Sequence, residues 1–176
     1  MCRFVTATLP ATAPIPVLDA IARSHGRQFQ RLLSPSVEGQ LKAGESYFLT
    51  TLGHCDCDAP LGQSRSQGSD EGEEARKLAR KGWSPAKVAR ALAQKRESAE
   101  ASFLARDGEA LMRWADFVRA VLASGHVPEL GLLLHHYRGP LDEEVSVRER
   151  RSVKVTAELP EVLRELDEDV LYLFHA

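Results

Sequence analysis

Six short segments carry alternating or continuous apolar residues, the patterns that predict β-strands. The predicted strands are residues 2–9, 27–33, 45–52, 129–137, 151–159 and 169–175. The first reads CRFVTATL and is rich in Val, Thr and Phe, which favour an extended backbone. A polar loop that contains Pro35, Gly39 and Gly44 separates the second predicted strand from the third.

Apolar residues recur every three or four positions in the segments between these strands, which predicts amphipathic helices. The predicted helices cover residues 17–26, 70–81, 85–106, 109–125 and 160–166. Ser84 and Pro85 form a favourable N-cap and first helical position, whereas the pair Asp107-Gly108 predicts a break. In the fourth helix one stripe is expected to be buried: Leu111, Trp114, Val118, Val121 and Leu122.

The order of these elements predicts an α+β fold with one mostly antiparallel sheet. Its β-α-β-β opening favours a ferredoxin-like arrangement, with a three-helix insertion over residues 70–125. Strand 2–9 is expected to pair antiparallel with strand 45–52 and also with the final strand. Residues 1–176 are interpreted as a single domain, in which the Gly-, Ser- and Gln-rich segment 60–72 forms an exposed loop.

Composition supports a soluble globular chain: 43% of the 176 residues are hydrophobic and 27% are charged. No apolar run approaches the roughly 18 residues that a membrane helix needs, and the N-terminal residues lack the apolar core of a signal peptide. We therefore expect a cytoplasmic protein with no membrane partner. In a reducing compartment, clustered cysteines are more often metal ligands or reactive thiols than disulfides.

All three cysteines are predicted to meet at one edge of the sheet. Cys2 begins the first strand, and Cys55 and Cys57 lie in the segment GHCDCD, directly after strand 45–52. His175 ends the final strand, so its expected pairing with strand 2–9 brings it to the same edge. Three thiolates and one imidazole form a common tetrahedral zinc set, and zinc is the expected cofactor. The site has a structural or partner-presenting role in this interpretation.

Neighbouring residues offer further ligands. His54 is an alternative to His175 if the chain turns at Gly53, whereas Asp56 and Asp58 are interpreted chiefly as turn residues before the following proline. Two alternatives compete with the metal site. The cysteines could be small buried apolar side chains, or Cys2 or the pair Cys55 and Cys57 could serve a cysteine-dependent enzyme.

The residues MCR resemble the start of N-terminal nucleophile amidotransferases. Loss of Met1 in such enzymes leaves a cysteine, here Cys2, whose own amine acts as the base. The resemblance is confined to this position, since the later Gly- and Asn-containing motifs of the family are missing. The chain is also short for the family's four-layer fold.

Charge is unevenly distributed, although the net charge is only −2. Residues 76–96 hold eight basic residues and no acid, whereas residues 158–169 hold six acids and one arginine. The basic run suggests an adaptor or regulator that binds an acidic protein or nucleic acid, and a solvated helix face is the alternative. The basic residues are Arg76, Lys77, Arg80, Lys81, Lys87, Arg90, Lys95 and Arg96.

The histidine pair His135-His136 lies within a predicted strand, so the two side chains must point to opposite faces. No Gly-rich nucleophile elbow accompanies them. The chain also lacks a phosphate-binding loop, a dinucleotide fingerprint and an H-E-x-x-H helix. No motif therefore predicts a reaction.

Overall fold

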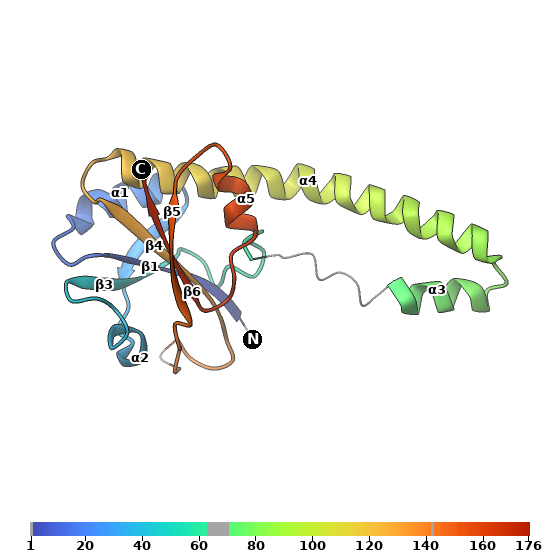
Figure 1. Ribbon diagram of the computed structural model, residues 1–176, viewed down its shortest axis with the longest axis horizontal. Helices are drawn as coiled ribbons and strands as arrows, with labels where there is room; N and C mark the ends of the chain where they lie inside the picture. The colour runs from blue at the N-terminus through green and yellow to red at the C-terminus, as the bar shows by residue number, and fades with distance from the viewer. Residues whose placement is uncertain (1, 63–70, 142) are drawn as a thin grey trace.

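A six-stranded sheet with strand order β2-β3-β1-β4-β6-β5 forms the main body of the molecule, at the left of Figure 1. The strands are β1 (Cys2–Pro10), β2 (Arg27–Arg31), β3 (Glu45–Thr51), β4 (Glu129–Tyr137), β5 (Glu149–Lys154) and β6 (Val170–His175). All neighbouring pairs are antiparallel except β5 and β6. The predicted α+β class with a mostly antiparallel sheet is confirmed.

The computed structural model describes residues 2–62, 71–141 and 143–176, without the side chains of 71–74 and 95–106. Within this part of the chain the helices are α1 (Ile15–Ser24), α2 (Pro35–Glu38), α3 (Glu71–Arg80), α4 (Pro85–Ala123) and α5 (Leu159–Arg164). Most of the predicted loop 60–72 lies outside the described residues, and so does Met1. The short helix α2 falls in the segment that we predicted as a loop.

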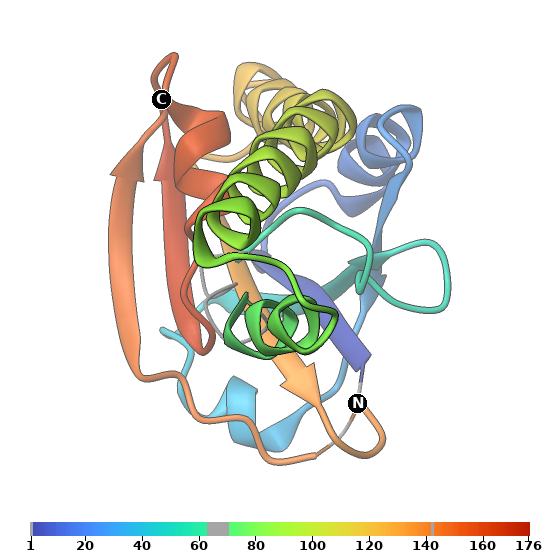
Figure 2. The ribbon, with the colours of Figure 1, turned by 90° about the vertical axis from the view of Figure 1, so that its right-hand side faces the viewer.

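The two faces of the sheet are covered differently (Figure 2). Helices α1, α4 and α5 pack on one face, where Leu18, Phe117 and Leu163 join the odd-numbered β1 residues Val5 and Ala7 in the main core. The predicted stripe on α4 is buried in this core. The opposite face carries a smaller cluster: Phe4, Val37, Tyr47, Leu133, Tyr137, Val145, Leu171 and Leu173. Strand alternation thus sorts the side chains between two cores.

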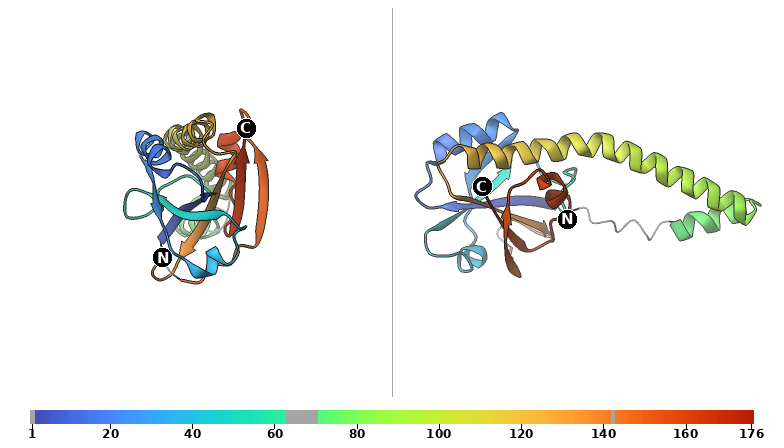
Figure 3. Two further views of the ribbon diagram at one scale, coloured as in Figure 1. Left: turned by 90° about the vertical axis from the view of Figure 1, so that its left-hand side faces the viewer. Right: turned by 45° about the horizontal axis from the view of Figure 1, so that its top comes forward.

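Helix α4 is continuous over 39 residues, so the predicted break at Asp107-Gly108 is wrong. Asp107 is buried, and Gly108 does not have a positive φ. An interior glycine costs a helix only about 1 kcal/mol, which the packing of the following turns offsets. Among the described residues, no helix is both long and apolar enough to cross a membrane. The predicted three-helix insertion therefore contains two helices, and α3 lies against the part of α4 that extends beyond the sheet (Figure 3).

The position of β4 in the sheet decides which strand ends lie side by side. Strand β1 pairs antiparallel with β3, as expected, but its other neighbour is β4 and not the final strand. Strand β4 is buried along most of its length, so it takes the central position and β6 pairs with it instead. The predicted pairing of the final strand with strand 2–9 is wrong. The ferredoxin-like arrangement stays a prediction, since the sheet continues past β4 through β6 and β5.

Substitutions at two glycines test the extent of α4, since Gly108 lies inside the helix and Gly125 lies just after its end. Replacing Gly108 with Ala should raise the free energy of unfolding by about 0.5–1 kcal/mol, because alanine loses less backbone entropy in a helix interior. Replacing Gly125 with Ala should lower the free energy of unfolding by about 1–2 kcal/mol. Gly125 has equally open surroundings but φ +70°, where an L side chain is strained. Urea denaturation measures both. A destabilising Gly108 substitution would contradict a continuous helix.

Candidate metal centre

The three cysteines meet where β1 begins and β3 ends. Because β1 and β3 are antiparallel, with Thr6 opposite Leu49, the start of one strand lies beside the end of the other. The chain then continues from Thr51 into the loop that carries Cys55 and Cys57. The Sγ atoms of Cys2, Cys55 and Cys57 all lie within 4.8 Å of one another. The predicted convergence of the three thiols is therefore present.

Arg3 fixes the cysteine loop against β1. Its guanidinium is buried, with 8% of the residue exposed, and it donates only to backbone carbonyls of the loop. Nε and Nη2 donate to the Asp56 carbonyl at 3.1 and 3.0 Å. Nη1 donates to Leu61 at 2.9 Å, and Nη2 also donates to Cys57 at 3.0 Å and to Ala59. Five donor contacts thus hold the loop against β1.

Asp56 is a buried anchor and not only the turn residue that we predicted. It is 4% exposed, and its carboxylate accepts hydrogen bonds from the Val5 N–H at 3.0 Å and from the Thr51 hydroxyl. The same carboxylate forms an ion pair with Arg27, whose guanidinium lies over the Trp114 ring. Asp58 is exposed, in agreement with its predicted place in a turn. The loop is therefore held by arginines from two strands: Arg27 of β2 pairs with the Asp56 carboxylate, and Arg3 of β1 binds the loop carbonyls.

Hydrogen bonding shifts the pKa values of the Cys55 and Cys57 thiols in opposite directions. The backbone N–H of Arg3 donates to the Cys57 sulfur at 3.3 Å, and this bond, together with one from Cys55, lowers the pKa of Cys57. The Cys55 thiol acts as the donor in their shared bond, so the pKa of Cys55 is raised. Cys57 is exposed and is the readier thiolate, the form that binds metals and reacts with electrophiles.

The structure does not place either predicted histidine with the sulfurs. His175 pairs with Glu129 at the start of β4, whereas Cys2 pairs with Tyr137 at its end. His175 therefore lies at the opposite end of the strands from Cys2. The prediction that it approaches the cysteines is wrong. His54 is exposed, and the ligand group found in the described part of the chain holds the three sulfurs without it.

The predicted partner-binding residues lie on the helical hairpin of α3 and α4. Arg76, Lys77, Arg80, Lys81, Lys87 and Arg90 are all exposed there, and the Lys87 ammonium lies 4.3 Å from the Trp83 ring centre. The side chains of Lys95 and Arg96 lie outside the described residues. The acidic partner stays a prediction.

Sequence reasoning missed the role of Arg3. The available signal was its position, since an arginine in the second place of an apolar strand must either end the strand or find buried acceptors. Comparisons of the chain with protein-family models, with curated proteins and with solved structures give no match. Its function therefore has to be inferred from its own residues.

The two aspartates of the loop provide a matched pair of variants. Replacing Asp56 with Asn should lower the free energy of unfolding by about 2–4 kcal/mol, because the half-buried Arg27 guanidinium loses its charge partner and the buried carboxylate loses its hydrogen bonds. Replacing Asp58 with Asn should change it by less than about 0.5 kcal/mol, because this side chain is exposed. Chemical denaturation compares them. Equal effects would contradict the anchoring role of Asp56.

Alkylation at a series of pH values tests the shared hydrogen bond. As the pH rises, iodoacetamide should label Cys57 before Cys55, because a lowered pKa yields thiolate at lower pH. Peptide mass spectrometry measures the two profiles. Replacing Cys55 with Ala removes the donor thiol and should move the Cys57 profile to higher pH. Coincident profiles in the unaltered protein would count against this arrangement.

Proposed function

We propose that the protein binds a thiophilic transition-metal ion through Cys2, Cys55 and Cys57 and presents it to a partner. The observation that carries this proposal is the convergence of three sulfurs within 4.8 Å. Thiolates at about 2.3 Å from one tetrahedral ion are held about 4 Å apart, which requires little movement of these side chains. Zinc is the first candidate, since three cysteine ligands are common in its sites.

An exchangeable role fits this site better than a structural one. A structural zinc ion supplies folding energy to a segment that lacks its own interactions. Here the Arg3 guanidinium and the Asp56 carboxylate already hold the loop, so the ligands are positioned before metal arrives. Cys2 and Cys57 are exposed, which gives an incoming donor access to the ion.

The donor set also favours presentation over hydrolysis. Three thiolates would surround a divalent ion with three negative charges, which weakens its pull on the electrons of a bound water. A fourth position would remain for a ligand from a partner. Cys55 lines a hollow of about 240 Å³ whose lining also includes Arg113 and Trp114 of α4, so a partner group could approach from that side. Reduced thiols are required, and we therefore place the protein in the cytoplasm.

The lowered pKa of Cys57 favours a second candidate, a redox-active thiol. In that function the Cys57 thiolate would attack a disulfide substrate, and Cys55 would displace the mixed disulfide to leave a Cys55–Cys57 bond and two substrate thiols. The close approach of the sulfurs serves either function. Metal content and disulfide formation, measured on the protein and on its single Cys→Ser variants, distinguish the two functions.

Metal content measured on untagged protein tests the primary proposal. About one equivalent of zinc should bind, and each single Cys→Ser variant should bind it at least about tenfold more weakly, because a thiolate ligand is lost. Cobalt added in place of zinc should give thiolate-to-metal charge-transfer absorption. Replacing His54 with Gln should leave the affinity unchanged if the fourth position is open.

One outcome would contradict the proposal, and a second measurement would then identify the redox candidate. Less than about a tenth of an equivalent of any metal after reconstitution under reducing conditions would reject it, because a three-thiolate site should bind tightly. A disulfide that forms with oxidised glutathione in such a metal-free protein would favour the redox candidate. Circular dichroism of each variant shows whether a loss of binding reflects a loss of fold.

A further inference from the structure

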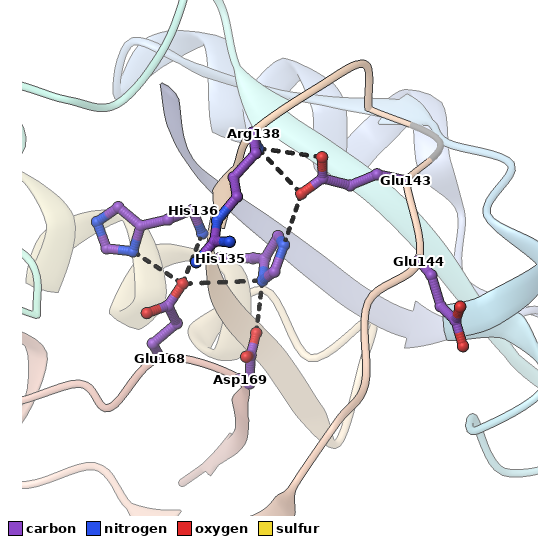
Figure 4. Close-up of a pocket in the computed structure, with 7 residues that line it drawn as sticks. All are labelled: His135, His136, Arg138, Glu143, Glu144, Glu168 and Asp169. Carbon is purple, nitrogen blue, oxygen red and sulfur yellow. Dashed lines mark hydrogen bonds and ion pairs between the residues drawn. The ribbon is translucent and has the colours of Figure 1, made fainter. Parts of the chain in front are cut away.

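A second group of candidate ligands lies in a hollow of about 610 Å³ at the end of β4 and the start of β6 (Figure 4). Ligand atoms of His135, Glu168 and Asp169 lie within 4.8 Å of one another. Asp169 precedes β6, and its backbone N–H donates to the Leu134 carbonyl at 3.0 Å. This hydrogen bond and the pairing of β4 with β6 hold Asp169 beside β4, which fixes the donors relative to one another as a rigid metal site requires.

His135 faces a carboxylate at each of its two ring nitrogens. Nδ1 lies 2.6 Å from Asp169 Oδ1, and Nε2 lies 3.2 Å from Glu143 Oε1. A neutral imidazole has one donor and one acceptor, whereas ionised carboxylates only accept. One of the two contacts is therefore unfavourable unless the ring is protonated or a cation takes the place of the proton. The ring also meets Tyr137 edge-on, which restricts its orientation.

Backbone and neighbouring groups hold the remaining carboxylates in place. Glu143 accepts hydrogen bonds from the backbone N–H groups of Arg138 and Gly139. Glu168 accepts from the His136 N–H at 3.0 Å. The His136 Nδ1 lies 3.0 Å from the same oxygen, and the His135 Nδ1 lies 3.9 Å from it, so the Glu168 carboxylate faces both histidines.

The hollow is also strongly negative. Four acids line it, Glu143, Glu144, Glu168 and Asp169, against the single fixed positive charge of Arg138. With neutral histidines the lining carries a formal charge of −3. A concave surface with this excess concentrates cations.

We propose that His135, Glu168 and Asp169, assisted by Glu143, bind a divalent cation of the Mn²⁺ type. One imidazole with several carboxylates is a harder donor set than three thiolates, and it suits manganese or iron(II) rather than a thiophilic ion. The open hollow leaves coordination positions for water or a small ligand. This site is independent of the cysteine site, although both lie at the same end of the sheet, where Cys2 pairs with Tyr137.

Titration of the full chain with Mn²⁺ tests this proposal, with electron paramagnetic resonance used to measure the concentration of free ion at each step. About one equivalent should bind, and the Cys2→Ser, Cys55→Ser, Cys57→Ser triple variant should bind equally well. Replacing Asp169 with Asn should weaken binding at least about tenfold. Asparagine is the chosen substitute because Asp169 has φ 62°, a conformation that Asn tolerates.

Glu144 provides the matched control. It lines the same hollow but lies outside the ligand group, so Glu144→Gln should change the affinity less than about twofold. Equal weakening in the Glu144 and Asp169 variants would show a diffuse negative potential and overturn the site. Paramagnetic broadening of the His135 ring signals in the unaltered protein is a second measurement. No broadening and no binding up to about 1 mM Mn²⁺ would show that the group is a self-contained ion-pair network.

Discussion

Strand β1 hydrogen-bonds to β3 on one side and to β4 on the other, and the meeting of the three thiols depends on the position that this double pairing gives it. Its register places Cys2 opposite Tyr137 and Thr6 opposite Leu49. A shift by one residue would move Val5 and Ala7 out of the main core and break two ladders at once. The position of the first thiol is therefore set by burial of apolar residues farther along the strand, and no metal is needed to define it.

The same strand carries the charge that shapes the cysteine loop. Arg3 points to the helix-covered face with Val5, and there it meets five carbonyl contacts in place of solvent. Asp56 supplies the opposite charge nearby and is balanced by Arg27. Buried charges are tolerated when every polar atom has a partner, and they then specify one arrangement strongly. The conformation of the cysteine loop therefore rests on protein contacts.

Two donor sets of different chemistry lie at this end of the sheet. Three sulfurs lie beside β1, and an imidazole with carboxylates lies where β4 ends and β6 begins. Soft and hard ligands select different ions, so the two sites need not compete for one metal. Their closeness follows from the pairing of Cys2 with Tyr137, two residues beyond His135.

The sequence alone located all six strands, the apolar stripe of α4 and the meeting of the three thiols, although the fifth strand ends at Lys154 and not at residue 159. These features depend on local periodicity and on the antiparallel pairing of β1 with β3. Tertiary structure decided which strand pairs with the second side of β1. Strand β4 takes that place instead of β6, because β4 offers the longer apolar surface. This placement moved His175 away from the thiols and brought Asp169 to His135. The inward turn of Arg3 and Asp56 was equally beyond local pattern, because a buried charge is stable only beside partners from distant segments.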